Sequence, residues 1–364
     1  MPASAVRLAS AEVRSSWGRG REGIRLNAQA LPAILASVLL VGCGTAAGAV
    51  SSAPARGEPA RLRLSPGGST AAVAAHRPHK AAHAGRRNFA KRVAIQGGRK
   101  LFITCRGTGS PTVVLEAGTG DLAKVWSMPP SGPGRAVFPA VARFTRVCAY
   151  DRPGTYLLPG TLSRSDPVAM PRSALDIVVD LRKLLHAADV PGPYVLVGHS
   201  FGGMVARQYA TLRPGRIAGL VSIDAQNEDF VAGYKEFLTP EQYLAAVLNP
   251  QPPPSLQTYS AVERLSLEIS AAQVRQAQAD TPLRRMPLTV LSHSRDLANP
   301  FGFPPDWPIN DLERAFQASQ DMLAELVPGA RHVTAAKSGH YIQLDQPRLV
   351  TRTIRAMVRE ARLK

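Results

Sequence analysis

A glycine-rich turn between an apolar strand and a helix constrains the fold of this chain more than any other feature. Residues 194–197 read Tyr-Val-Leu-Val, and after them come Gly198-His199-Ser200-Phe201-Gly202-Gly203 and a helical pattern. In a strand-turn-helix of this kind the serine is held in a strained backbone conformation with its hydroxyl above the sheet, and side chains two residues to either side would collide. We therefore expect Ser200 to be a nucleophile, with Gly198 and Gly202 as the glycines of its elbow. A glycine-rich phosphate loop would need the P-loop lysine and threonine.

A positioned base is needed beside Ser200, because a serine hydroxyl is a weak nucleophile until its proton is taken. The chain has eight histidines. Seven of them are placed where they do not face Ser200. His76, His79 and His83 lie before residue 88, His186 lies on a predicted helix, His199 lies on the wrong side of the turn, and His293 and His332 lie at strand ends. His340 lies in a loop beyond the last predicted strand, at the edge of the sheet where Ser200 emerges. The sequence therefore predicts His340 as the base.

An aspartate that orients His340 should follow a strand ending at the same edge of the sheet. The predicted strand 288–292 is followed by His293-Ser294-Arg295-Asp296, which brings Asp296 to that edge. Ser200, Asp296 and His340 then follow one of the three common chain orders of such triads. Asp224 is the competing acid, since it ends the predicted strand 218–223. We expect Asp296, because an aspartate placed like Asp224 more often caps the next segment.

Short apolar runs alternate with longer amphipathic stretches from Phe89 onward, which predicts one domain of α/β class with a mostly parallel sheet and helices on both faces. The predicted strands cover residues 92–96, 101–106, 112–116, 146–150, 194–198, 218–223, 288–292 and 332–335. The clearest helix covers residues 173–188, where apolar residues recur at helical spacing. Residues 225–287 are too long for a loop, and they predict a helical cap over the carboxyl edge of the sheet.

Four motifs within residues 89–364 resemble those of the α/β-hydrolase superfamily, especially its capped, exported members. They are PTVVLEAGTG, RVCAYDRPG, YVLVGHSFGG and SGHYIQLDQP. The resemblance implies an eight-stranded sheet with an antiparallel second strand and a cap after the sixth. It also places the amide of Thr119 beside that of Phe201, where the two would bind the oxyanion of a tetrahedral intermediate. Ala117 replaces the family's usual histidine, and the turn that begins at Asp151 lacks the family's second glycine and its serine.

Two cysteines, Cys105 and Cys148, fall on the second and fourth predicted strands, which the α/β-hydrolase strand order makes neighbours. Opposed Cα atoms on adjacent antiparallel strands lie about 4.5 to 5.5 Å apart, near the range that a disulfide tolerates. Export would place the pair in an oxidising compartment. We therefore expect a disulfide. Two buried free thiols are the alternative, because the sequence does not set the cross-strand register.

Residues 1–50 look like an export signal or a membrane anchor. Five arginines precede residue 26, and no charged residue occurs from Leu26 to Ala55. Leu40-Val41-Gly42-Cys43 resembles a bacterial lipobox, which makes Cys43 a candidate for lipidation, while Ala47-Gly48-Ala49 offers a cleavage site for a soluble exported protein. The uncharged run is also long enough to remain in a bilayer as an anchor. Residues 51–88 have the composition of a disordered linker.

The formal charge of +18 raises the question of a nucleic-acid partner. Half of this excess lies in residues 1–88, where 12 basic residues stand against 3 acidic ones. The rest of the chain has no cluster in which basic residues interleave with aromatic ones, as a base-stacking groove requires. We therefore expect no nucleic-acid partner and attribute part of the charge to a basic face on the C-terminal helix.

These features predict a serine hydrolase that acylates Ser200 without a metal or organic cofactor. An apolar pocket that suits small-molecule carboxylic esters of modest size is expected from aromatic residues of the cap and the loop after Asp296, namely Phe230, Tyr234, Phe237, Tyr243, Tyr259, Phe301, Phe303 and Trp307. An aminopeptidase or amidase of the same fold is an alternative, since Glu228, Asp229 and Glu236 offer carboxylates to an ammonium group. The rival from another class is a non-catalytic protein that only binds a ligand, which has no use for a strained serine. The sequence does not indicate an oligomeric state.

Overall fold

The computed structural model describes residues 88–157, 160–251, 254–257, 259–283, 286–294, 299 and 303–363, all within the unit formed by residues 32–364. Four features predicted from the sequence lie outside these residues. They are the export segment with Cys43, residues 51–87 of the linker, Asp296 and the aromatic residue Phe301.

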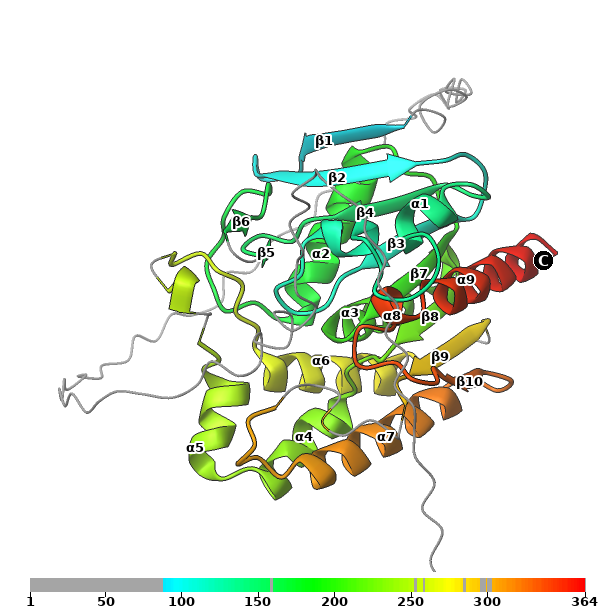
Figure 1. Ribbon diagram of the computed structural model, residues 1–364. Helices are drawn as coiled ribbons and strands as arrows, with labels where there is room; N and C mark the ends of the chain where they lie inside the picture. Colours follow the sequence, from blue (N-terminus) through cyan, green and yellow to red (C-terminus); the bar gives the residue numbers. More distant parts are fainter. Residues whose placement is uncertain are drawn as a thin grey trace, which may run out of the picture. The chain divides into compact units, whose positions relative to one another are not determined.

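Eight strands form the central sheet, in the order β1-β2-β4-β3-β7-β8-β9-β10 (Figure 1). They are β1 (Phe89–Ala94), β2 (Lys100–Arg106), β3 (Thr112–Glu116), β4 (Val147–Tyr150), β7 (Tyr194–His199), β8 (Ile217–Ile223), β9 (Leu288–Ser292) and β10 (Arg331–Thr334). β2 runs antiparallel to both of its neighbours, and the strands from β4 to β10 in this order run parallel to one another. The predicted fold class and all eight predicted strands are confirmed, with strand ends that differ by up to three residues. A separate small sheet pairs β5 (Tyr156–Leu157) with β6 (Thr161–Leu162).

Both faces of the sheet are covered by helices, which explains why its central strands β3, β4 and β7 are buried at every position. Val114 and Leu196 pack into the apolar cluster that includes α2 (Ala174–Ala187) and α3 (Phe201–Leu212). Their chain neighbours Val113 and Val195 pack into the cluster on the opposite face, with α1 (Val137–Val141) and α9 (Pro347–Arg362). This alternation follows from the two-residue period of a strand, and it fixes the direction in which each strand delivers its last residue.

Helix α2 ends within one residue of the boundaries expected from its apolar spacing. The Ser173 side chain accepts a hydrogen bond from the Asp176 amide, and the Asp176 carboxylate accepts one from the Ser173 amide. Such a capping box satisfies two of the amides that a helix N-terminus leaves without partners. The shorter helical segments are η4 (Ala123–Ser127), η5 (Pro214–Arg216) and α8 (Ile342–Asp345).

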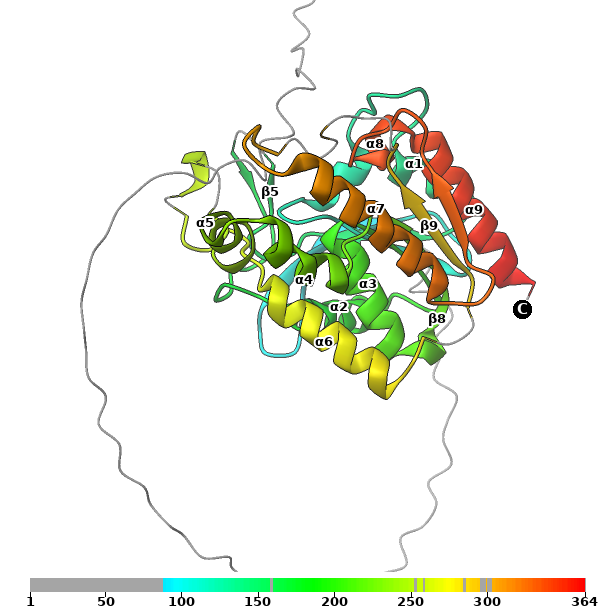
Figure 2. The ribbon, with the colours of Figure 1, turned by 90° about the horizontal axis from the view of Figure 1, so that it is seen from below.

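The chain between β8 and β9 is helical in its described parts. It forms α4 (Glu228–Phe237), α5 (Pro240–Tyr243), the π-helical turn η6 (Leu244–Leu248), the 3-10 turn η7 (Pro254–Leu256) and α6 (Leu267–Asp280). Figure 2 shows α4 and α6 beside α3, with α7 (Ile309–Glu325) next to α4. This helical segment leaves the sheet at the end of β8, and α7 follows β9.

The predicted disulfide between Cys105 and Cys148 is present, and it joins β2 to β4. The two residues are directly opposed in the antiparallel register, with their Cα atoms 4.1 Å apart. Both side chains are completely buried. The register that the sequence left open therefore brings the two thiols together inside the sheet.

Candidate active site

Ser200 lies at the junction of β7 and α3 in a backbone conformation that residues with a Cβ rarely adopt, with φ 54° and ψ −126°. The Ser200 amide donates to the Ile223 carbonyl at 3.0 Å, which ties the turn to the neighbouring strand. Gly198 and Gly202 permit the close approach of the chain around it. A Cβ at Gly198 would lie 2.3 Å from the Gly202 carbonyl oxygen, and one at Gly202 would lie 2.4 Å from the Ala117 carbonyl oxygen. The turn therefore has the strained geometry of a nucleophile elbow.

His340 follows β10, and its Nδ1 donates to Oδ2 of Asp224 at 2.6 Å. We assign the proton to Nδ1 because the partner is a carboxylate, and in this tautomer Nε2 carries no proton and can accept one. The sequence argument favoured Asp296 as the partner of His340, but the carboxylate at Nδ1 belongs to Asp224. Asp224 therefore replaces Asp296 as the candidate acid, and Asp296 itself lies outside the described residues.

Asp224 is available to His340 because it does not cap the helix that follows it. The N-cap of α4 is Asn227, whose side chain accepts from the Asp229 amide at 2.6 Å. At Asp224 the backbone turns with φ 45°, and its amide donates to the Leu291 carbonyl at 2.7 Å. The cap therefore lies three residues after Asp224, which leaves the Asp224 carboxylate to His340.

Two histidines donate to the Asp224 carboxylate, which is completely buried. Besides His340, His293 approaches with its Nδ1 2.9 Å from Oδ2 and with its backbone amide 2.8 Å from Oδ1. Burial raises the pKa of Asp224, but the charge and the hydrogen bonds of His293 and His340 outweigh burial and lower that pKa to about 2. Asp224 is therefore ionised at neutral pH, as an orienting carboxylate must be.

His293 is a residue that the sequence analysis set aside as a strand end. Its Nε2 lies 2.8 Å from Oε1 of Glu313 on α7, and its ring stacks on Phe316 with the centroids 5.4 Å apart. Burial lowers the pKa of His293, but Asp224 and Glu313 outweigh burial and raise it to about 9. No local sequence motif predicts the contact between His293 and Glu313, because Glu313 lies 20 positions further along the chain.

His199 supports His340 from the side of the elbow. Its Nε2 donates to the His340 carbonyl at 2.9 Å, and the two rings lie 4.7 Å apart between centroids. Burial, followed by the nearby His340, lowers the pKa of His199 to about 3, so this histidine is neutral. The residue beside the nucleophile therefore fixes the backbone of the candidate base.

The amides of Thr119 and Phe201 are the candidate oxyanion donors. The neighbouring amides of the turn are already occupied: Gly120 donates to Oε2 of Glu263 at 2.7 Å, and Asp121 donates to the Gly118 carbonyl at 3.2 Å. Within the described parts of the chain, neither the Thr119 amide nor the Phe201 amide has an acceptor. Phe201 is the first residue of α3, where the helix dipole also favours negative charge.

Arg152, which is buried, holds the oxyanion turn in place. It donates to the carbonyls of Ala117 at 2.7 Å and Gly118 at 2.5 Å. Its charge is balanced by Glu116 at 2.8 Å and Glu263 at 2.7 Å. The sequence analysis did not identify Glu263, because this residue lies 111 positions from Arg152 and 143 positions from Gly120.

The acidic residues proposed for an ammonium site are paired or exposed. Glu228 is buried against Arg207, with Oε1 2.9 Å from Nη1, and Asp229 pairs with Arg275 at 2.9 Å. Glu236 is exposed. Among the predicted pocket aromatics within the described residues, five are buried, Phe237 is half-buried and Tyr259 is 49% exposed; the buried ones are Phe230, Tyr234, Tyr243, Phe303 and Trp307.

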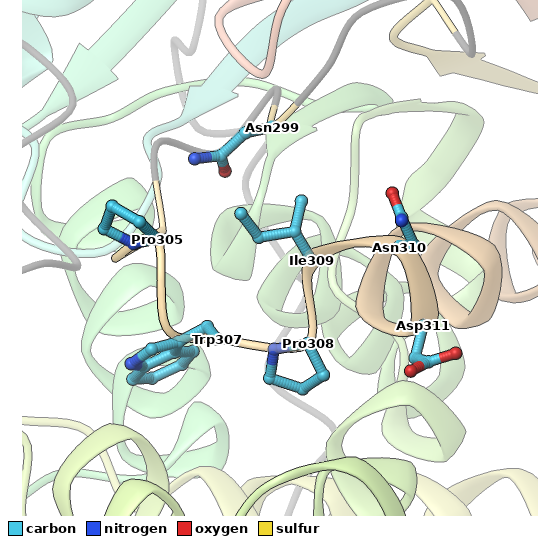
Figure 3. Close-up of a pocket in the computed structure, with 7 residues that line it drawn as sticks. All are labelled: Asn299, Pro305, Trp307, Pro308, Ile309, Asn310 and Asp311. Carbon is cyan, nitrogen blue, oxygen red and sulfur yellow. The ribbon is translucent and has the colours of Figure 1, made fainter.

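An open hollow of about 380 Å³ lies where the chain enters α7. Figure 3 shows Asn299 on one side of this hollow and Trp307 and Pro308 on the other. Ser200, His340 and Asp224 are not among its lining residues. We therefore do not assign the substrate to this hollow.

In the part of the chain that the structure describes, no group of three or more histidine, cysteine, aspartate or glutamate side chains has an arrangement fit for a metal ion. No helix among the same residues is both long enough and apolar enough to cross a bilayer.

Known proteins resemble this chain at several levels. An uncharacterised protein of Schizosaccharomyces pombe is 36% identical over 104 residues, which are 28% of this chain and 18% of that protein. A putative carbamate hydrolase RutD of Pseudomonas syringae is 22% identical over 282 residues, which are 71% of this chain and 97% of that protein. A crystal structure of a putative acyltransferase from Salmonella enterica has a TM-score of 0.49 at 16% identity, and the similarity covers 75% of this chain and 96% of that one.

The chain spans only 18%, 18% and 12% of the lengths of the first three curated relatives that it matches. The alpha/beta hydrolase family itself matches residues 113–353, which is more than half of the 364 residues. The matched segment contains Ser200, Asp224 and His340 on the eight-stranded sheet described above. This chain therefore belongs to the alpha/beta hydrolase family.

Proposed function

We propose that this protein is a serine hydrolase that works through an acyl-enzyme formed on Ser200. One observation carries the proposal. His340 donates from Nδ1 to the buried Asp224, which leaves His340 in the tautomer whose Nε2 accepts a proton, at the sheet edge where the strained Ser200 elbow ends β7. A neutral histidine held in this tautomer is the base that a serine nucleophile requires.

The reaction follows from these three side chains. The Ser200 hydroxyl oxygen attacks the acyl carbon while its proton passes to Nε2 of His340. The carbonyl double bond opens, and its electrons form an oxyanion on the former carbonyl oxygen. As that oxygen re-forms its double bond, the bond to the leaving group breaks and the leaving group takes the proton from His340. A water molecule then repeats the sequence on the acyl-enzyme and releases the acid.

The oxyanion would be bound by the amides of Thr119 and Phe201. Each fixed donor of this kind stabilises the transition state by about 3 kcal/mol. The support for the pair is that both amides lack an acceptor within the described residues, while the amides of Gly120 and Asp121 are used inside the protein. The Arg152 contacts to Ala117 and Gly118 would keep the turn rigid during the reaction.

We propose carboxylic esters of modest size as the substrate class. The buried aromatic side chains near the helical segment favour apolar acyl or alcohol groups. The pairing of Glu228 with Arg207 and of Asp229 with Arg275 argues against an ammonium site, and therefore against an aminopeptidase. The RutD proteins named as putative carbamate hydrolases would also act on an acyl carbonyl, so carbamates belong in the substrate panel.

Labelling with a fluorophosphonate tests the proposal, because this probe reacts with an activated serine without needing the natural substrate. We expect the wild-type protein to be labelled on Ser200, as located by peptide mass spectrometry, and Ser200→Ala to remain unlabelled. A folded wild-type protein that is not labelled would instead favour the non-catalytic ligand binder. A panel of p-nitrophenyl esters, aryl carbamates and aminoacyl anilides then ranks the substrate classes, with the esters expected to turn over fastest.

A further inference from the structure

Asp224 receives two histidines, and the reaction above uses only His340. We propose that His293 is a positioning residue, held as an imidazolium between Asp224 and Glu313, that fixes Asp224 for His340 and sets the pH above which His340 takes the proton of Ser200. This inference rests on the proposed function, since it concerns how the base of that reaction is tuned. The reaction described above gives the buried His293 no role of its own.

Both oxygens of the Asp224 carboxylate are in contact with histidines. Oδ2 accepts from Nδ1 of His340 at 2.6 Å and lies 2.9 Å from Nδ1 of His293. Oδ1 lies 3.0 Å from the same His293 nitrogen and accepts the His293 backbone amide at 2.8 Å. The carboxylate is therefore held through both of its oxygens by His293, and it cannot rotate away from His340 without breaking these bonds.

Both ring nitrogens of His293 face carboxylates. Nε2 lies 2.8 Å and 3.0 Å from the two oxygens of Glu313, opposite the Asp224 contact at Nδ1. A neutral imidazole carries one N–H, so it cannot donate to an acceptor on each side, whereas an imidazolium donates from both nitrogens. Gln317 donates from its amide nitrogen to Oε1 of Glu313 at 2.9 Å and so fixes the second carboxylate; the same nitrogen lies 3.0 Å from Nε2 of His293, where two donors form no hydrogen bond. Burial lowers the pKa of His293, but the two carboxylates raise it to about 9, which agrees with a protonated His293 at neutral pH.

The imidazolium of His293 lies close to His340, the candidate base. His293 and His340 bind the same Asp224 oxygen, so their charges are separated by one carboxylate. Glu313 faces His293 from α7, Phe316 packs on both rings, and His199, which faces His340 from β7, is neutral. A fixed positive charge at this distance disfavours a second proton on His340.

The test is the pH profile of fluorophosphonate labelling in His293→Asn. Asparagine places an N–H donor near the position of Nδ1, so the contact with Asp224 is kept while the positive charge is removed. In a plot of labelling rate against pH, we expect the fall-off on the acid side to move to a pH about one unit higher than in the wild-type protein. At any pH below this fall-off (the acid limb), the labelling rate should be about tenfold lower than that of the wild-type protein. The plateau rate at high pH should change by less than about threefold, because the base is again neutral there. The matched control is His332→Asn, since His332 also pairs with a carboxylate, Asp321 at 3.0 Å, and touches Ser292 on β9.

A labelling rate that falls equally at every pH in His293→Asn, with the acid limb unmoved, would overturn the inference and leave His293 a purely structural role. The same conclusion would follow if His332→Asn moved the limb as far. Wild-type protein that is not labelled at any pH would instead defeat the proposed function.

NMR of protein with carbon-13 in its histidine rings tests the charge of His293 without any reaction. We expect His293 to stay protonated at pH 7.5 in the wild-type protein and to lose its proton at a lower pH in Glu313→Gln. This readout holds even if His293→Asn fails to fold. A His293 that is neutral at pH 7.5 in the wild-type protein contradicts the inference.

Discussion

The peptide groups around Ser200 approach one another so closely that two positions of the elbow have no room for a side chain. Gly202 lies against the carbonyls of Ala117 and Glu116, which end the strand that carries the oxyanion turn. The distance between the nucleophile and the candidate oxyanion donors is thus set by backbone packing. Glycine at this position is a requirement of the site and not only of the turn.

Gly202→Ala should therefore damage both activity and stability. Its Cβ would lie 2.4 Å from the Ala117 oxygen and 2.6 Å from the Glu116 oxygen, both of which are backbone atoms. We expect fluorophosphonate labelling to slow by more than about tenfold and the free energy of unfolding in urea to drop by about 1 to 3 kcal/mol. Gly215→Ala is the matched control, because a Cβ there meets no atom within 4 Å. Equal behaviour of the two variants would show that the elbow has more room than the structure gives it.

Elements far apart in the sequence supply the parts of the site that sequence reasoning missed. Ser200 and His340 could be placed because each follows a predicted strand, and parallel strands deliver their last residues to one edge. The choice between Asp224 and Asp296 depended on where α4 begins, which is a matter of a few residues at a helix end. Glu263 and Glu313 carry no pattern of their own, since their partners are brought to them only by the packing of the helices.

The pairing of β2 with β4 leads to a prediction about stability. The disulfide between Cys105 and Cys148 closes a loop of 43 residues and is buried. A bond that closes a loop of about this length contributes roughly 3 to 4 kcal/mol, mostly by restricting the unfolded chain. The variant with Cys105→Ala and Cys148→Ala should lose about that much in urea unfolding, compared with the oxidised wild-type protein. A loss of less than about 1 kcal/mol would mean that the bond adds little to the packing of the two strands.

The molecule as a whole should be less stable in mild alkali than in mild acid, because two buried groups hold protons that the unfolded chain releases. Burial raises the pKa of Asp121 to about 7 despite the opposing charge of Arg152, and Asp224 and Glu313 raise the pKa of His293 to about 9 against the effect of burial. Asp121 titrates near pH 3.9 and His293 near pH 6.5 when the chain is unfolded. Between pH 3.9 and about 7 the folded protein keeps a proton on Asp121 that the unfolded chain has lost, and between pH 6.5 and about 9 it keeps one on His293. The contribution of these two groups to the free energy of unfolding therefore falls as the pH rises.

We expect the free energy of unfolding in urea to be lower at pH 9 than at pH 5 by about 4 kcal/mol. Asp121 and His293 each lower it by about 3 kcal/mol, and His199, whose pKa is lowered to about 3, offsets about 2 kcal/mol of this loss between pH 5 and pH 6.5. Asp121→Asn should remove the part of this loss that falls between pH 5 and pH 7. The pKa of Asp224, at about 2, leaves its contribution complete over this whole range and adds no slope. Equal stability of the wild-type protein at the two pH values would contradict the assignment, as would an unchanged slope in Asp121→Asn.

Export of the whole chain stays a prediction, because residues 1–87 lie outside the described part of the structure. If Cys43 receives a lipid, Cys43→Ala should stop the incorporation of labelled fatty acid and move the protein out of the membrane fraction. Unchanged fractionation of Cys43→Ala, with the leader still present, would instead indicate an anchor that spans the bilayer.

The proposed activity depends most on the identity of the acid that orients His340, and one comparison of variants tests that identity directly. Asp224→Asn should slow ester hydrolysis and fluorophosphonate labelling by a factor on the order of 10⁴, because an amide at this position favours the wrong tautomer of His340. Asp296→Asn, the matched change at the competing position, should slow both by less than about tenfold. Circular dichroism of each variant confirms that it is folded before the rates are compared. A greater loss in Asp296→Asn than in Asp224→Asn would contradict the hydrogen bond from His340 to Asp224 as the basis of the activity.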